Sequence, residues 1–146
     1  MEGRLETLNA KRFLQQLEKL DRLIENKLIE KAQWYSIALG TTAQLGGERV
    51  QSSGSQQKMA DAVGKYVDIE SEIDCDIDRL VDAKKKVIRV IEQLDVAEYN
   101  LLHKVYVQYM TLQEAADACG RSYTWATSTH GRALQNVQSI LDRDET

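Results

Sequence analysis

The chain has 146 residues, 42% of them hydrophobic and 29% charged, with a net charge of −4 and a sequence pI of about 5.2. This length allows one or two small domains, no apolar run approaches the roughly 18 residues of a membrane span, and the acidic balance is the opposite of that usual in DNA-binding proteins. Because the sequence has no proline, only eight glycines and no alternation typical of a strand, we expect an all-α protein with long helices.

The first predicted element is an amphipathic helix over residues 5–39, which at about 1.5 Å per residue would be roughly 50 Å long. A single helix cannot bury its own apolar stripe, so we expect it to pack in an antiparallel hairpin. Charges of both signs on its polar face argue against a membrane-surface helix. Its apolar residues recur every three or four positions and are Leu5, Leu8, Phe13, Leu14, Leu17, Leu20, Ile24, Leu28, Ala32, Tyr35 and Ala38.

A stretch rich in glycine, serine and threonine, residues 40–55, interrupts the helical pattern. It has no hydrophobic periodicity, and this composition predicts a flexible connection between two helices. Long loops are often functional. Contact of Arg49, Ser52 and Ser53 with phosphate or with a partner is therefore the alternative.

A second long helix is predicted from Ser55 or Gln56 to about Leu94, so that residues 1–94 form a coiled-coil-like two-helix arm. Near-heptad spacing supports a long helix–helix seam. The apolar positions are Met59, Val63, Tyr66, Ile69 or Glu70, Ile73, Ile77, Leu80, Val87, Ile91 and Leu94.

Charge is segregated along this second helix. Acidic residues occupy every even position from Asp68 to Asp78, and such positions spread around a helix instead of converging on a metal ion. They predict a solvated face paired with lysines of the first helix. A basic cluster follows at Lys84, Lys85, Lys86 and Arg89. We expect a solvated face here too, with contact to DNA phosphates as the alternative.

The C-terminal part, residues 95–146, is predicted to form a separate helical domain. Asp95 with Glu98 is an N-cap pattern that opens a helix reaching about Tyr109. The apolar side of this helix consists of Leu101, Leu102, Val105, Tyr106 and Tyr109.

Residues 111–141 predict a helix-turn-helix. Thr111 and Glu114 form a capping-box pattern, Gly120 stands where a helix ends with φ > 0, and Ser122 is a good N-cap for a second helix. The first helix presents Leu112, Ala115, Ala116 and Cys119 on one face. The second is expected to turn inward Trp125, Ala126, Thr129, Ala133, Leu134, Val137, Ile140 and Leu141, and outward Tyr123, Thr124, Thr127, Ser128, Gln135, Asn136 and Gln138. An ordinary helical hairpin within a bundle is the alternative interpretation.

The segment TLQEAA at 111–116, the Gly-x-Ser at 120–122 and the Ala-Leu pair at 133–134 resemble region 4 of bacterial sigma factors. The block HGRAL at 130–134 is similar to the His-Gly-x-Ala-Leu ending of phage regulators of the RinA and ArpU type, as is IDRLVD at 77–82 leading into Leu101-Leu102 and Tyr109. The resemblance covers roughly residues 32–141. It implies a helical arm followed by a sigma region 4-like domain, and a phage or prophage regulator of late, packaging-gene transcription.

This chain departs from the sigma-factor pattern at the start of the second helix. Sigma factors carry Arg, Glu and Arg there, whereas Tyr123, Thr124 and Thr127 stand at the matching positions. The sigma-factor contacts to a promoter −35 element therefore do not carry over to this sequence.

We accordingly expect sequence-specific binding of double-stranded DNA for transcription control. Hydroxyls and amides can donate to phosphates or read base edges. The expected DNA-binding residues are Arg121, Ser122, Tyr123, Thr124, Thr127, Ser128, His130, Arg132 and Gln113. From Cys119 to Leu141 there is no acidic residue.

The overall charge of the C-terminal part points the other way. Residues 95–146 contain four Lys or Arg and seven Asp or Glu, a net charge of −3, so phosphate neutralisation contributes little affinity. We expect a homodimer through the helical arm, or RNA polymerase as a partner, to compensate for this weak electrostatic affinity for DNA. The alternatives are an adaptor that docks on RNA polymerase without touching DNA and a packaging component that recognises DNA ends. An apolar exposed patch at Tyr123 and Trp125 would favour a protein partner.

Enzymatic chemistry is not expected, because the sequence has no phosphate-binding glycine loop, no nucleophile elbow and no His near a Cys or acid in a catalytic spacing. No cofactor or metal is expected either, since Cys75 and Cys119 are far apart and form no ligand pair. Reduced structural thiols fit a cytosolic protein. Residues 1–30 lack the continuous apolar core of a signal peptide, so we expect a cytoplasmic location in a bacterial host cell and no membrane partner.

Overall fold

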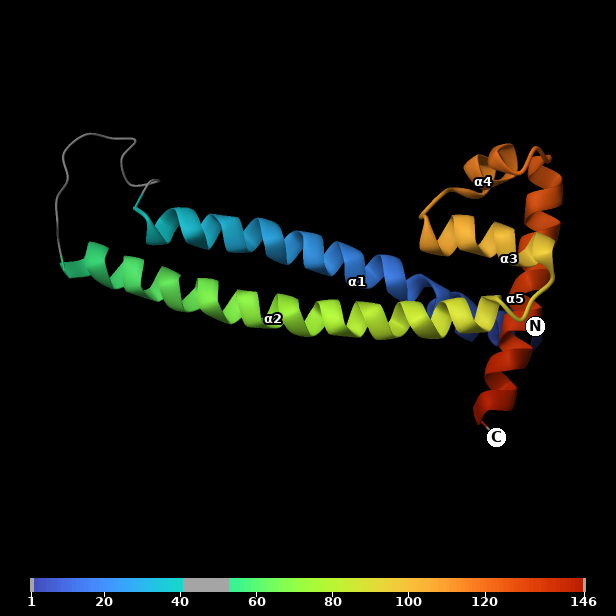
Figure 1. Cartoon of the computed structure of the whole chain (residues 1–146), viewed down its shortest axis with the longest axis horizontal. Helices are drawn as coiled ribbons and strands as arrows, with labels where there is room; N and C mark the ends of the chain where they lie inside the picture. The colour runs from blue at the N-terminus through green and yellow to red at the C-terminus, as the bar shows by residue number, and fades with distance from the viewer. Residues whose placement is uncertain (1, 41–52, 146) are drawn as a thin grey trace. The chain divides into compact units, whose positions relative to one another are not determined.

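The computed structural model describes residues 2–40 and 53–145, and all its regular elements in those ranges are helical. The helices are α1 (Glu2–Ala38), α2 (Ser53–Ile91), α3 (Val96–Leu102), α4 (Leu112–Ala118) and α5 (Tyr123–Glu145), with a π-helical segment, η2 (His103–Val107), after α3 (Figure 1). The predicted all-α fold, with two long helices and a helical domain, is confirmed. Residues 41–52 of the predicted flexible connection at 40–55 lie outside the described residues. Residues 53–55 are the start of α2, so the second helix begins two residues before the predicted Ser55.

The chain forms two compact units. Unit 1 contains the described residues up to Lys19 and from Leu80 onward, and unit 2 contains those from Leu20 to Arg79. The predicted boundary near residue 94 thus differs from the division in the structure, since the start of α1 and the end of α2 belong with α3, α4 and α5.

A buried hydrogen bond shows why the start of α1 belongs to unit 1. The backbone N–H of Ala10 donates to Oε1 of Gln138, at 2.9 Å, in α5. The prediction that Gln138 points outward is wrong, because only 7% of this residue is exposed. Its amide is sheltered where α1 covers the second half of α5, a contact that helical periodicity within α5 cannot reveal.

Unit 2 consists of parts of α1 and α2 that pack antiparallel along one heptad seam. The seam positions follow spacings of four and three residues on both helices. On α1 they are Leu20, Ile24, Lys27, Lys31, Trp34 and Ala38, and on α2 they are Ala62, Tyr66, Ile69, Ile73 and Asp76. Tyr35 and Tyr66 bring their rings to 5.7 Å.

Ion pairs fix the register of this hairpin. Nζ of Lys27 lies 2.6 Å from Oδ2 of Asp76, and Nζ of Lys31 lies 3.6 Å from Oε1 of Glu70. The hydrogen bond to Asp76 raises the pKa of Lys27. The predicted pairing with lysines of the first helix is confirmed for Glu70, Glu72 and Asp76. Asp76 is only 4% exposed, however, and does not lie on a solvated face.

One hydrophobic cluster of unit 1 lies where α3, α4 and α5 meet. Leu101 packs against Ala115, Ala116 and Ala126, all four of them fully buried. Partly buried side chains surround this cluster, namely Val105, Met110, Leu112 and Trp125. The three alanines have no side chain beyond Cβ, so the backbones of α4 and α5 approach closely.

Candidate nucleic-acid interface

The turn between α4 and α5 has the geometry of a Schellman motif. The N–H of Arg121 donates to the carbonyl of Ala116 at 2.9 Å, and the N–H of Gly120 donates to that of Asp117 at 3.1 Å. Gly120 has φ 66°, as predicted for the residue that ends the first helix. The turn therefore ends α4 and redirects the chain within four residues, a length typical of helix-turn-helix motifs.

Both helices of the motif are capped as predicted, with one difference. Oγ1 of Thr111 accepts from the N–H of Glu114, and Oγ of Ser122 accepts from the N–H of Trp125, each at 3.1 Å. The carboxylate of Glu114 was expected to accept from the backbone N–H of Thr111. It accepts instead from the hydroxyl of Thr111, at 3.1 Å, because one hydroxyl can donate and accept at once.

Two glycines on this motif provide a matched pair of substitutions. Neither Gly120 nor Gly131 has an atom within 4 Å of an added Cβ, so only the backbone distinguishes them. Gly120→Ala should lower the free energy of unfolding by about 1 kcal/mol, since a left-handed residue with Cβ is strained. Gly131→Ala should raise it by up to about 1 kcal/mol, since alanine favours a helix interior. Urea unfolding measures both free energies. A change of the same sign in the two variants would contradict a left-handed Gly120 and a helical Gly131.

The inner face of α5 follows the sequence prediction. Ala126, Thr129, Ala133, Leu134, Val137 and Ile140 are buried, and Trp125 and Leu141 are half-buried. This face packs on α3 and α4, so the opposite face of the first turns of α5 is open to solvent.

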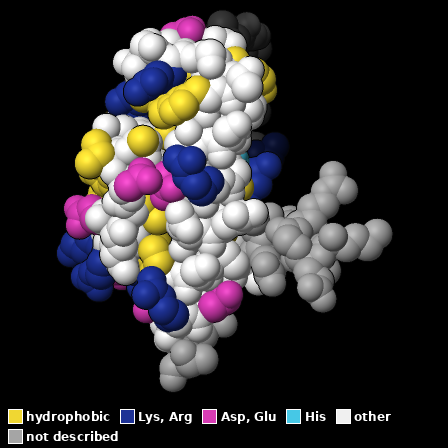
Figure 2. All heavy atoms as spheres, turned by 90° about the vertical axis from the view of Figure 1, so that its right-hand side faces the viewer, with side chains coloured by type: hydrophobic (Ala, Val, Ile, Leu, Met, Phe, Trp, Pro, Cys, Tyr) yellow, Lys and Arg dark blue, Asp and Glu magenta, His cyan; other side chains and the backbone are white. Residues whose placement is uncertain are grey.

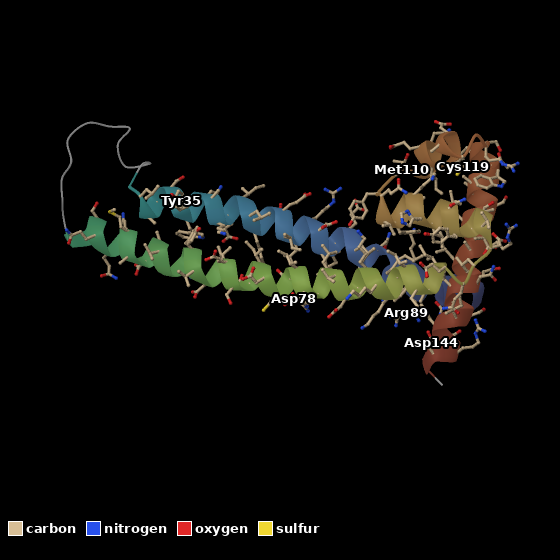
Figure 3. All side chains as sticks on the ribbon, viewed as in Figure 1. Tyr35, Asp78, Arg89, Met110, Cys119 and Asp144 are labelled. Atoms are coloured by element: carbon tan, nitrogen blue, oxygen red, sulfur yellow. The ribbon has the colours of Figure 1, made fainter. Side chains whose placement is uncertain are left out.

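The open face of α5 begins at the turn and carries hydroxyls. Tyr123, Thr124, Thr127 and Ser128 are all exposed, and Arg121 and Ser122 precede them on the exposed turn. Figure 2 views the side on which α5 lies, where backbone and uncharged polar side chains cover most of the surface between small groups of charged and hydrophobic side chains. Cys119 and Met110, labelled in Figure 3, mark the two ends of α4 beside this face.

Two side chains on this face have defined local partners. The hydroxyl of Thr127 donates to the carbonyl of Thr124 at 2.9 Å, which leaves oxygen lone pairs and the methyl group for other contacts. The guanidinium of Arg121 lies over the ring of Trp125, 5.6 Å from its centroid. This cation–π contact holds the arginine at the turn.

The structure uses the other three predicted DNA-binding residues for internal contacts. Nε2 of Gln113 donates to Asp117 at 3.0 Å, Nε of Arg132 donates to Glu98 at 2.8 Å, and Nε2 of His130 lies 2.6 Å from the hydroxyl of Tyr106. Arg121, Ser122, Tyr123, Thr124, Thr127 and Ser128 are thus brought together on one surface, whereas Gln113, His130 and Arg132 support the helices behind or beside it.

Glu98 has a role that the sequence did not indicate. As predicted, its N–H is capped by Oδ1 of Asp95, at 2.8 Å. Its side chain is buried and accepts from Arg132 and also from Nδ2 of Asn136, at 3.0 and 3.1 Å. This carboxylate fastens α3 to the middle of α5, and so positions α5 within unit 1.

His130 and Tyr106 form a second link to α5. Their rings are stacked with centroids 5.7 Å apart. Burial raises the pKa of Tyr106 to about 12. Burial also lowers the pKa of His130 below its ordinary value of 6.5, and the charge of Lys11 lowers it further. The neutral form of His130 is therefore the one that the folded protein favours.

This preference predicts a pH dependence of stability. A histidine with a lowered pKa in the folded state binds its proton more readily when unfolded, so its contribution is complete above pH 6.5 and is lost as the pH falls below that value. We expect the melting temperature to decrease between pH 7 and pH 5, and to decrease less in His130→Gln. Burial also lowers the pKa of His103. The pH dependence of the melting temperature in His130→Gln is therefore compared with that in His103→Gln. A slope unchanged by His130→Gln would contradict this account.

Comparisons with protein-family models, with curated proteins and with solved structures found no match to this chain. The resemblance to sigma region 4-like regulators stays a prediction. Within the part of the chain that the structure describes, no helix is long and apolar enough to cross a membrane. In the same residues, no group of three or more His, Cys, Asp or Glu side chains could hold a metal ion.

Proposed function

We propose that this protein is a DNA-binding transcription regulator that reads double-stranded DNA through α4 and α5, as a phage or prophage regulator of late genes would. The observation that supports it best is the open face of α5. A capped, glycine-ended turn leads into a helix whose first two turns expose hydroxyl groups and no carboxylate. A recognition helix with these properties can enter the major groove with its N-terminal residues against base edges.

The residues at the turn are suited to phosphate. The N-terminus of α5 is the positive end of the helix dipole, which favours an anion. Arg121 adds a guanidinium and Ser122 a hydroxyl at the same point. An exposed basic cluster belongs to the same unit and consists of Lys84, Lys85, Lys86 and Arg89. It supplies positive charge, whereas residues 95–146 alone have a net negative charge.

Thr124, Thr127 and Ser128 are the proposed base-reading residues. They lie three and four positions apart on one side of α5 and are exposed. A threonine methyl group can contact the methyl group of thymine, and a hydroxyl can donate to or accept from either kind of base pair. These three side chains therefore set the sequence preference in this proposal.

The proposal is tested by measuring binding to overlapping DNA fragments that together cover the promoters of the phage, at low and moderate salt. Wild type should shift a subset of fragments, and Thr127→Ala should weaken that shift. Ser139→Ala is the matched control, because Ser139 is an exposed hydroxyl on the same helix that also donates to a backbone carbonyl, that of Gln135 at 3.1 Å. No shift of any fragment at low salt would overturn the proposal.

A specific observation supports a second candidate, an adaptor that docks on RNA polymerase. Tyr123 is 51% exposed at the start of α5, next to the half-buried Trp125. Exposed aromatic side chains are enriched at protein interfaces. A polymerase pull-down that fails with Tyr123→Ala but not with Thr127→Ala would favour the adaptor, and selective binding to fragments carrying DNA ends would favour a packaging component.

A further inference from the structure

Unit 2 leaves more large apolar side chains in solvent than it buries. Its buried hydrophobic residues among those described are Ile24, Ala62, Ile69 and Ile73. The exposed ones are Leu23, Leu28, Ile29, Tyr35, Leu39, Met59, Val63, Val67 and Ile77. One seam between two helices cannot cover both faces of the layer they form, so the hairpin has unpartnered apolar surface.

Most of this surface lies on one side of the hairpin. On α1 the residues that directly follow a seam residue in the sequence include Leu28, Ala32, Tyr35 and Leu39. On α2 they include Val63, Val67 and Ile77. A step of one residue turns about 100° around a helix. Because the two helices run antiparallel, the same step brings both stripes to the same side of the layer. We call these seven residues the open hairpin face; Tyr35 is labelled in Figure 3.

The other side of the layer has a different character. The residues that directly precede the seam residues on α2 are Asp61, Lys65, Asp68, Glu72 and Cys75. All of these side chains are exposed, and four of the five are charged. Water therefore suits this side, whereas the open hairpin face combines two adjacent apolar stripes with few charges.

We propose that the open hairpin face packs against the same face of a second copy of this chain, giving a four-helix bundle. Its stripes repeat the four–three spacing of the seam, which is the spacing that knobs-into-holes packing between helices requires. A two-fold axis along the hairpin places the α1 stripe of each copy over the α2 stripe of the other. Opposed helices are then antiparallel, as they are within each hairpin.

The size of the face fits a weak dimer. The face spans residues 63–77 of α2, roughly 21 Å at about 1.5 Å per residue, and is two helices or about 20 Å wide. It therefore presents on the order of 420 Å² per copy, or about 840 Å² in total, which is the size of a weak, transient interface.

The charges on the face allow such contact. Two acidic residues, Glu70 and Asp74, interrupt the α2 stripe, and Glu70 is paired with Lys31. Beside them on α1 lies the small Ala32, which leaves room for a longer side chain. The proposal does not depend on DNA binding, because it rests on unit 2 alone.

Sedimentation equilibrium of the full chain at several concentrations tests the proposal. Wild type should sediment at twice 16.6 kDa in the micromolar range. Leu28→Glu places a charge in the interface and should raise the dissociation constant about 30-fold or more, since burying an unpaired charge costs at least 2 kcal/mol. Leu23→Glu is the matched control, with the same change five residues earlier on the opposite side of the hairpin, and should leave the mass unchanged.

A milder variant separates loss of association from unfolding of the helices. Val67→Thr keeps the shape of an exposed side chain and should leave the circular dichroism spectrum unchanged, while raising the dissociation constant about tenfold through the buried hydroxyl. A wild-type mass of 16.6 kDa at concentrations on the order of 100 μM, or equal loss of association in Leu28→Glu and Leu23→Glu, would overturn the proposal.

Discussion

Glu98→Ala is expected to lower the free energy of unfolding by about 3 kcal/mol, a large part of the stability of a small domain. The substitution removes the three hydrogen bonds that the carboxylate accepts from Arg132 and Asn136 and leaves a space between α3 and α5. The loss stays at the lower end of the range for broken buried pairs, because the side chain of Arg132 is 56% exposed and can return to water. Urea unfolding of the full chain measures it.

The reverse substitution separates charge from packing. Arg132→Met keeps an apolar stem but leaves a carboxylate that is 3% exposed with Asn136 as its remaining side-chain donor. We therefore expect Arg132→Met to destabilise the protein more than Glu98→Gln, which removes the charge and keeps the shape. Glu92→Ala, at an exposed acid in the same unit, is the control and should change stability by less than about 0.5 kcal/mol. Similar losses for Glu98→Ala and Glu92→Ala would refute the structural role of Glu98.

Ser128→Glu is expected to weaken DNA binding by roughly 10- to 100-fold without unfolding the protein. The proposed interface brings this position near phosphates, and two like charges about 4 Å apart repel by 1 kcal/mol in water and by more in a partly dry interface. Ser128 is exposed on α5, so the glutamate should cost the free protein little. Fluorescence anisotropy with a fragment selected by wild type measures the dissociation constant, and the effect should shrink as salt is added.

Ser71→Glu provides the matched control for this charge. Ser71 is also an exposed serine within a long helix, in unit 2, and the substitution changes the net charge of the chain by the same amount. We expect its DNA affinity to stay within about twofold of wild type. Equal weakening by the two substitutions would mean that total charge, and not the α5 surface, governs binding.

The features that sequence predicted well are those encoded by neighbouring residues. Thr111, Ser122 and Gly120 mark the ends of α4 and α5 because a cap needs only a hydroxyl three positions from a free N–H, or a residue that tolerates φ > 0. The inner face of α5 follows from the 3.6-residue period in the same way. These signals act within one or two helical turns and do not depend on how the chain folds back on itself.

The features that were missed depend on contacts between distant parts of the chain. Glu98 meets Arg132 and Asn136, which lie 34 and 38 residues later, and an acid after Asp95 looks like an ordinary cap residue. Gln138 meets Ala10 across 128 residues. Asp76 is one of six alternating acids, and only its place opposite Lys27 distinguishes it. A polar residue within a periodic pattern does not show whether a partner will cover it.

The paired seam of unit 2 makes the length of the hairpin adjustable only in fixed increments. Removing seven residues from each helix, beyond Lys27 and before Asp76, would shorten the hairpin by about 10 Å and keep these two side chains opposite each other. Removing seven residues from one helix alone would displace its remaining seam residues from their partners on the other helix. Removing a number of residues that is not a multiple of seven from both helices would shift the seam around each helix. Homologous arms, or engineered ones, should therefore differ in length by whole heptads inserted or deleted in both helices together.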